Sequence, residues 1–110
     1  MEIKDLKDYK RGWVIGDFLP SILRTKDFEV GLLEHKKGEF WPAHVHNIVT
    51  EYNILIEGRL TINSIEILPY QIFIIPPGEP TKAIFLEDCK IIVIKTPSIP
   101  KDKYEINYTG

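Results

Sequence analysis

The sequence GEFWPAHVHNIVTEYNILIEG, residues 38–58, carries the densest set of structural and chemical signals in the chain. His44 and His46 are two residues apart, so both imidazoles point to the same face if this segment is a strand. Four residues then precede Glu51, enough for a bend and re-entry into the next strand. Two imidazoles and one carboxylate suit divalent iron, manganese, nickel or zinc, with coordination positions left open. This stretch therefore predicts a metal site with His44, His46 and Glu51 as its ligands.

The same stretch resembles the first motif of the cupin family. The fixed positions of that motif are occupied, at matching spacing, by Gly38, His44, His46, Glu51 and Gly58. The resemblance implies an all-β fold, the double-stranded β-helix, which is a small jelly-roll-like barrel of two facing antiparallel sheets. It also implies that the two histidines and the glutamate face the inside of this barrel.

The second cupin motif is present only in part. Pro76-Pro77-Gly78 supplies its Pro-x-Gly turn, whereas Tyr70, Thr81 and Phe85 stand where the family has Gly, His and Asn. Thr81 thus replaces the fourth metal ligand of the family, and Gln71 or a water molecule is a candidate to fill that position. The resemblance accordingly implies a site with three protein ligands.

The rest of the chain consists of short runs of Ile, Val, Phe and Tyr between Gly, Pro and Asn turns, and no segment keeps a helical period. A spacing of about 8–12 residues between such runs is typical of a sandwich or barrel. We therefore expect a single cupin domain over residues 1–110, with residues 1–25 as a candidate dimerisation arm and residues 101–110 as a polar tail. The expected strands include residues 28–32, 52–56, 60–62, 65–67, 72–75, 83–85 and 91–94.

Composition limits the partners and the compartment. The chain has 110 residues and a net charge of −2, without the basic patch that binds nucleic acid or an anionic membrane. Its apolar runs are too short to cross a bilayer, and its charged N-terminus lacks a signal-peptide core. Cys89 is the single cysteine, which fits a reducing cytoplasm. We expect a cytoplasmic homodimer that binds a small molecule, because apolar outer strand faces leave surface for a partner.

Four further side chains are candidates for the wall of a ligand pocket. Asn53 shares the facing of Glu51 along a strand, and its amide is either a substrate contact or a hydrogen-bonded core group. Trp41 precedes the two histidines and either walls the pocket or packs in the core. Gln71 and Thr81, from the second motif, complete this set.

Two other polar residues receive structural interpretations. His35 precedes Gly38 and is expected at the surface or at a strand edge. Lys95 shares the facing of Ile91 and Val93 but stands at a strand end. An exposed lysine is the default interpretation of Lys95, and an inward acid or electrophile near a substrate is the alternative.

Three functions fit these residues. The first is a metal-dependent enzyme, such as an oxygenase or isomerase, acting on a small organic acid or sugar. The second follows from residues 11–18, 26–39 and 93–104, which loosely resemble sugar-nucleotide ketoisomerase and epimerase cupins. That resemblance implies metal-free catalysis, in which His44 or His46 takes a proton and a tyrosine returns it. The third is a non-enzymatic barrel that holds a metal or a small ligand, because this fold hosts unrelated functions.

Overall fold

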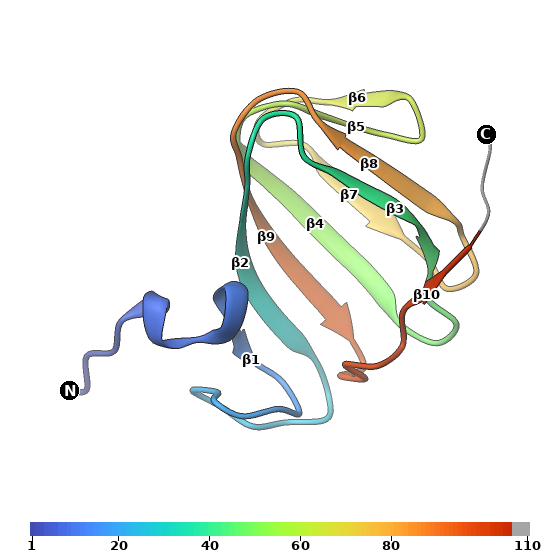
Figure 1. The fold of residues 1–110 in the computed structure, drawn as a ribbon. Helices are drawn as coiled ribbons and strands as arrows, with labels where there is room; N and C mark the ends of the chain where they lie inside the picture. Colours follow the sequence, from blue (N-terminus) through green and yellow to red (C-terminus); the bar gives the residue numbers. More distant parts are fainter. Residues whose placement is uncertain (107–110) are drawn as a thin grey trace.

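The computed structural model describes residues 1–106 and builds them around two facing antiparallel sheets (Figure 1). Each sheet has five strands, in the order β1-β2-β9-β4-β7 in one and β10-β3-β8-β5-β6 in the other. This architecture confirms the all-β barrel predicted from the sequence. Within the described residues, no helix has the length and apolar character needed to cross a membrane. The elements are η1 (Leu6–Asp8), η2 (Lys10–Gly12), β1 (Trp13–Ile15), β2 (Glu29–His35), β3 (Phe40–Val45), β4 (Thr50–Glu57), β5 (Leu60–Ile62), β6 (Ile65–Ile67), β7 (Ile72–Ile75), β8 (Thr81–Phe85), β9 (Cys89–Thr96) and β10 (Tyr104–Glu105).

The core of the barrel follows from the alternation of side chains along the strands. In β4, Asn53 and Leu55 are buried while Tyr52 is exposed, as expected for a strand with one face inward. Fully burying a leucine side chain such as that of Leu55 stabilises the fold by about 1.5–3 kcal/mol. The buried cluster consists of Leu55, Leu60, Phe85, Cys89, Ile91 and Val93.

The register of the first sheet sorts the inward side chains into rows that cross the strands. Glu29 of β2 pairs with Lys95 of β9, and Lys95 pairs with Glu51 of β4; we call these three residues the charged row. Each of these three strands carries an aliphatic side chain four residues further into the barrel than its residue of the charged row. The barrel interior therefore changes from charged to apolar between the two rows. The deeper set, which we call the apolar row, consists of Leu33, Ile91 and Leu55.

Two turns have residues with positive φ, a backbone conformation that glycine and asparagine tolerate well. Gly78 ends the Pro76-Pro77-Gly78 turn with φ of 83°, a conformation that glycine adopts without steric cost. Its N–H donates to the carbonyl of His46 at 2.7 Å, so the turn of the second motif contacts the strand end of the first. Asn63 and Ser64 form a tight turn between β5 and β6, with φ of 49° and 67°. Positive φ at both central residues matches the twist of a hairpin.

The N-terminus and β10, the last described strand, lie on opposite sides of the barrel (Figure 1). Residues 101–106, expected as part of a polar tail, instead join the second sheet, because β10 pairs with β3 and the Asp102 carboxylate is buried against backbone donors. The remainder of that expected tail, residues 107–110, lies outside the described residues. At the other end, β1 pairs with β2 of the same chain, and a dimerisation role for residues 1–25 stays a prediction.

Candidate metal centre

The structure brings His44, His46 and Glu51 together at one end of the barrel interior. His44 lies in β3, His46 follows that strand directly, and Glu51 is the second residue of β4. One candidate ligand atom from each residue lies within 4.8 Å of the other two. Nε2 of His46 and Oε2 of Glu51 are 3.0 Å apart. The three side chains predicted from the sequence therefore form one cluster.

Backbone carbonyls fix the tautomers of both imidazoles. Nδ1 of His46 donates to the carbonyl of Asp102, and Nδ1 of His44 donates to the carbonyl of Pro42 at 3.3 Å. A carbonyl oxygen only accepts, so the proton of each neutral ring lies on Nδ1. Nε2 is then the nitrogen whose lone pair is available to a metal ion.

The pKa values of the three candidate ligands are shifted in different directions by burial and by their neighbours. Burial alone would raise the pKa of Glu51, but the hydrogen bond from His46 and the charge of Lys95 hold it below its usual value. Burial alone would lower the pKa of His46, but acceptance by Glu51 and by the Asp102 carbonyl raises it. Burial and the Lys103 ammonium lower the pKa of His44. His46 is thus more readily protonated than His44, because it lies against Glu51.

This donor set fits a divalent transition metal ion. Two Nε2 lone pairs and one carboxylate meet on one side of the cluster, and the second nitrogen of each ring is already engaged by the backbone. Thr81, which replaces the family's fourth ligand, is buried and pairs in register with His44. A hydroxyl is a poor substitute for imidazole, so three protein ligands leave positions for water or a small molecule.

Asp102 holds the loop that carries His46, a role that was not evident from the sequence. Its carboxylate accepts the backbone N–H groups of Asn47, Ile48 and Val49 at 2.8–3.0 Å. Burial alone would raise the pKa of Asp102, but these three donors hold it below its usual value. Asp102 therefore fixes both the loop between β3 and β4 and the ring of His46. Its position far along the chain, in a polar segment, gave no signal of this role.

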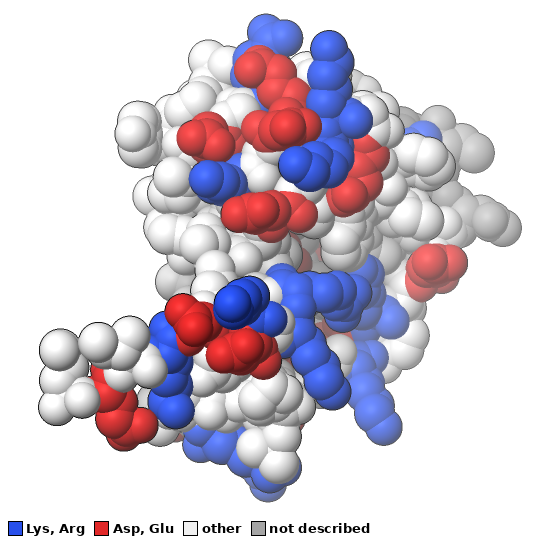
Figure 2. All heavy atoms as spheres, turned by 60° about the vertical axis from the view of Figure 1, so that its left-hand side comes forward, with Lys and Arg blue, Asp and Glu red and all other residues white. Residues whose placement is uncertain are grey.

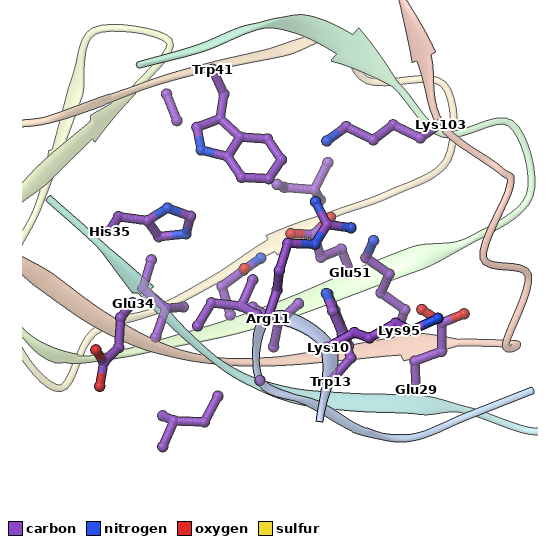
Figure 3. Close-up of a pocket in the computed structure, with 18 of the residues that line it drawn as sticks. Lys10, Arg11, Trp13, Glu29, Glu34, His35, Trp41, Glu51, Lys95 and Lys103 are labelled. Atoms are coloured by element: carbon purple, nitrogen blue, oxygen red, sulfur yellow. The ribbon is translucent and has the colours of Figure 1, made fainter. Parts of the chain in front are cut away.

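A cavity of about 890 Å³ lies between the two sheets, and its wall includes the three candidate ligands His44, His46 and Glu51, which we call the metal cluster. Asn53, Trp41 and Thr81 line it, as the sequence analysis proposed for a pocket wall. Asn53 is 3% exposed and donates from Nδ2 to the carbonyl of Phe73 at 3.5 Å. Figure 3 shows Trp41 on the side of the cavity opposite the first sheet.

Gln71 is not part of this cavity, which corrects the pocket expected from the sequence. It lies in the turn before β7 and is exposed. Its Oε1 accepts the backbone N–H of Leu68 at 2.8 Å, so the side chain caps its own turn. Tyr70, which precedes it, has φ of 68° and is exposed. Gln71 therefore does not fill the missing ligand position.

His35 is a buried cavity residue, and its expected place at the surface is wrong. It ends β2 on the same face as Leu33 and is 8% exposed. Its ring stacks on Phe85 at 4.2 Å and meets Trp41 edge-on at 5.4 Å. Nδ1 of His35 and Oε2 of Glu39 are 2.5 Å apart, an ion-pair geometry within the cavity wall. Strand alternation places this ring inward.

Two lysines cover tryptophan rings at the cavity. Nζ of Lys95 lies 4.9 Å from the centre of the Trp13 ring, and Nζ of Lys103 lies 3.8 Å from that of Trp41. Lys95 is therefore an inward residue, the alternative that the sequence analysis left open. Burial and the Lys95 ammonium lower the pKa of Lys103 to about 8. The two like charges are close enough to disfavour each other.

Comparison with known proteins shows which solved structures share this fold. No family model matches the sequence, and no curated protein matches it either. Solved structures with the same arrangement of sheets are double-stranded β-helix and cupin proteins, and this chain accordingly has the fold of a small cupin domain.

Three of these structures show the extent of the likeness. An uncharacterized conserved protein with a double-stranded β-helix domain from Klebsiella pneumoniae has a TM-score of 0.71 at 20% identity, over 96% of this chain and 92% of that one. A cupin-2 domain containing protein from Shewanella frigidimarina has a TM-score of 0.59 at 26% identity, over 68% and 76%. The DMSP lyase DddQ from Ruegeria pomeroyi has a TM-score of 0.71 at 12% identity, over 89% of this chain and 51% of that one. At such identities the likeness establishes the fold alone.

Proposed function

We propose that this protein binds one divalent transition metal ion through His44, His46 and Glu51 and uses it on a small molecule held in the barrel cavity. The observation that carries the proposal is the convergence of the three ligand atoms within 4.8 Å on the cavity wall. A similar fold in the DMSP lyase DddQ supports an enzyme acting on a small molecule. The reaction class we favour is metal-assisted chemistry on a small organic acid or sugar, such as an oxygenation or isomerisation.

The chain's own residues prepare this chemistry. A bound divalent ion would supply Lewis acidity and polarise a substrate oxygen. Backbone carbonyls orient the two histidine rings, and Asp102 holds the loop between them and Glu51. Lys103 has a pKa near neutrality, so it holds or releases a proton at the cavity under ordinary conditions.

Elemental analysis tests the metal claim. The protein is purified without chelator or nickel resin and measured by inductively coupled plasma mass spectrometry. About one equivalent of transition metal is expected for the wild type and far less for His44→Ala and Glu51→Gln, since three-ligand sites depend on each ligand. Glu57→Gln is the matched control, because Glu57 is an exposed carboxylate paired with Lys90. Metal retained by both ligand variants would place the site elsewhere.

The same samples separate the alternatives. A protein without metal at any stage, which binds a nucleoside-diphosphate sugar, would favour the metal-free isomerase or epimerase. A protein that holds metal without changing any small molecule would favour the non-enzymatic barrel. Tyr9 lines the cavity and is the tyrosine we would assign to the metal-free mechanism.

A further inference from the structure

The cavity changes character along the barrel. At one end lie the charged row and the metal cluster, and four residues deeper lies the apolar row. Around the apolar row the wall is aliphatic and aromatic, and the pair of His35 and Glu39 lies beyond Leu33 on the same side. The cavity-lining residues of this apolar end include Leu33, Ile62, Phe73, Phe85, Ile91 and Val93. A ligand that fills the space must match a charged end and an apolar end.

Four cationic side chains line the charged end: Lys10, Arg11, Lys95 and Lys103. In Figure 3 the side chains of Lys10, Arg11 and Lys95 extend into the cavity from its lower side, and that of Lys103 extends from the opposite side toward Trp41. Figure 2 shows lysine and arginine side chains gathered beside the hollow of the surface. Over residues 1–106, none of these four side chains forms an ion pair with a carboxylate within 4.0 Å. Their charge is therefore not balanced by a protein partner at contact distance.

The acidic residues of the cavity are engaged elsewhere. Oε2 of Glu29 accepts the hydroxyl of Ser98 at 2.9 Å, and Oε2 of Glu51 faces His46. Glu39 pairs with His35 at the other side of the cavity. Glu34 also lines the cavity, but Figure 3 shows its carboxylate pointing away from the four cations.

The backbone holds this cationic arrangement in advance. Arg11 has φ of 51°, an uncommon conformation for a residue with a side chain. The next residue, Gly12, has φ of 84°, and a Cβ there would lie 1.9 Å from the carbonyl oxygen of Leu32. Only glycine permits this approach to β2, which puts Arg11 at the cavity. Lys95 and Lys103 are held against Trp13 and Trp41, so little ordering remains to be done on binding.

We infer that the cavity binds an amphipathic organic anion, with its acidic group among Arg11, Lys95 and Lys103 and its apolar body toward Leu33 and Ile91. This inference deepens the proposed function, because the acidic group then lies beside the candidate metal cluster. A carboxylate receives charge-assisted hydrogen bonds from ammonium and guanidinium groups, and the apolar end gains from losing water. The substrate class is thus an organic acid rather than a neutral sugar.

Octanoate and octanol are suitable probes, since they share an eight-carbon body and differ at the acidic group. Binding to the full chain is measured by isothermal titration calorimetry, both after metal removal and after loading with zinc. We expect octanoate to bind at least about tenfold more tightly than octanol in both forms, and high salt to weaken octanoate selectively. Equal affinity for the two probes, or no binding of octanoate to either form, would overturn the inference.

Variants locate the acidic group. Lys95→Met and Arg11→Met are each expected to weaken octanoate binding about tenfold while leaving octanol binding unchanged. Lys82→Met is the matched control, because Lys82 is exposed on β8 and does not line the cavity. Octanoate affinity that survives both cavity substitutions contradicts the proposed position. Thermal unfolding of each variant checks that it is folded.

Different results would overturn the metal site and the anion site. Selective octanoate binding by protein that takes up no zinc on loading supports the anion site and counts against the metal proposal. Metal bound by His44, His46 and Glu51 without selectivity for octanoate supports the metal site and overturns the anion site. Reading both measurements on the same preparation keeps the outcomes separate.

Discussion

The Nδ1–H of His46 donates to the main-chain carbonyl of Asp102, although the two residues are 56 positions apart in the chain. The Asp102 carboxylate meanwhile accepts three backbone N–H groups from the loop that follows His46. One residue thus fixes both the ring of a candidate ligand and the loop that leads to Glu51. This contact ties the C-terminal segment to the metal cluster.

Asp102→Ala is expected to destabilise the fold by about 3 kcal/mol, because three backbone N–H donors, of which that of Val49 is buried, lose a charged acceptor. Chemical denaturation monitored by tryptophan fluorescence measures the free energy of unfolding. Lys101→Ala, at an exposed neighbouring position, serves as the control and should change stability by less than about 0.5 kcal/mol. Similar stability of the two variants would show that Asp102 does not hold the loop.

Asp102 also predicts the direction of a pH effect on stability. Its pKa in the folded protein is lowered, since three backbone donors favour the carboxylate despite burial. The carboxylate therefore stabilises the fold above the ordinary aspartate pKa of about 3.9, and this contribution is lost as the pH falls through the folded-state pKa. Asp102→Asn should be less stable than the wild type at pH 7, with a difference that shrinks in acid. A difference independent of pH would contradict this assignment.

His46 links metal binding to proton release. Without a metal ion, its raised pKa keeps a proton between Nε2 and Glu51, and a metal ion must displace that proton. Zinc affinity should therefore fall as the pH drops below the raised His46 pKa, by up to about tenfold per pH unit. Calorimetry in buffers of different ionisation enthalpy counts the released proton. Zinc binding without proton release would argue against His46 as a ligand.

His35 provides a test of packing in the cavity wall. His35→Ala removes a ring that stacks on Phe85 and should cost about 2–4 kcal/mol of stability. His35→Phe keeps an aromatic ring but removes the contact with Glu39, so its cost should be near 1 kcal/mol, as for one hydrogen bond. Denaturant unfolding of both variants measures these differences. An alanine variant as stable as the wild type would show that the His35 ring makes no buried packing contribution, as expected for a surface residue.

The outer face of the first sheet predicts a homodimer. Tyr52 pairs in register with Ile74, Ile54 pairs with Ile72, and both rows continue onto apolar residues of β9. Ile72 is 63% exposed, so part of this apolar surface is open to a partner. Sedimentation velocity at micromolar concentration should give a dimer for the wild type and a monomer for Ile74→Lys. The control is Ile65→Lys, an exposed position on the other sheet, and a monomeric wild type would end this proposal.

The three candidate ligands could be identified from the sequence because they lie close together in the chain, and their binding of a metal ion stays a prediction. His44 and His46 share a face through strand alternation, and one short loop returns the chain to Glu51. Asn53 and Trp41 were placed at the cavity for the same local reason. The second motif was weaker evidence, and the position of Gln71 depended on a turn hydrogen bond that its spacing did not reveal.

The remaining site residues depend on contacts between distant segments. Arg11, Lys95 and Lys103 come from opposite ends of the chain and meet only because β2 and β9 are neighbours and residues 101–106 return to β3. No local periodicity encodes such an arrangement, so no basic patch was evident from the sequence. His35 was misplaced because the length of β2, which carries it inward, was not evident from the sequence.

Anomalous X-ray diffraction from crystals of the zinc-loaded protein tests the central claim most directly. The account predicts one strong anomalous peak about 2.0–2.2 Å from Nε2 of His44, Nε2 of His46 and a carboxylate oxygen of Glu51. A peak bound to other residues, or none at this cluster when the protein carries one equivalent of zinc, would contradict it.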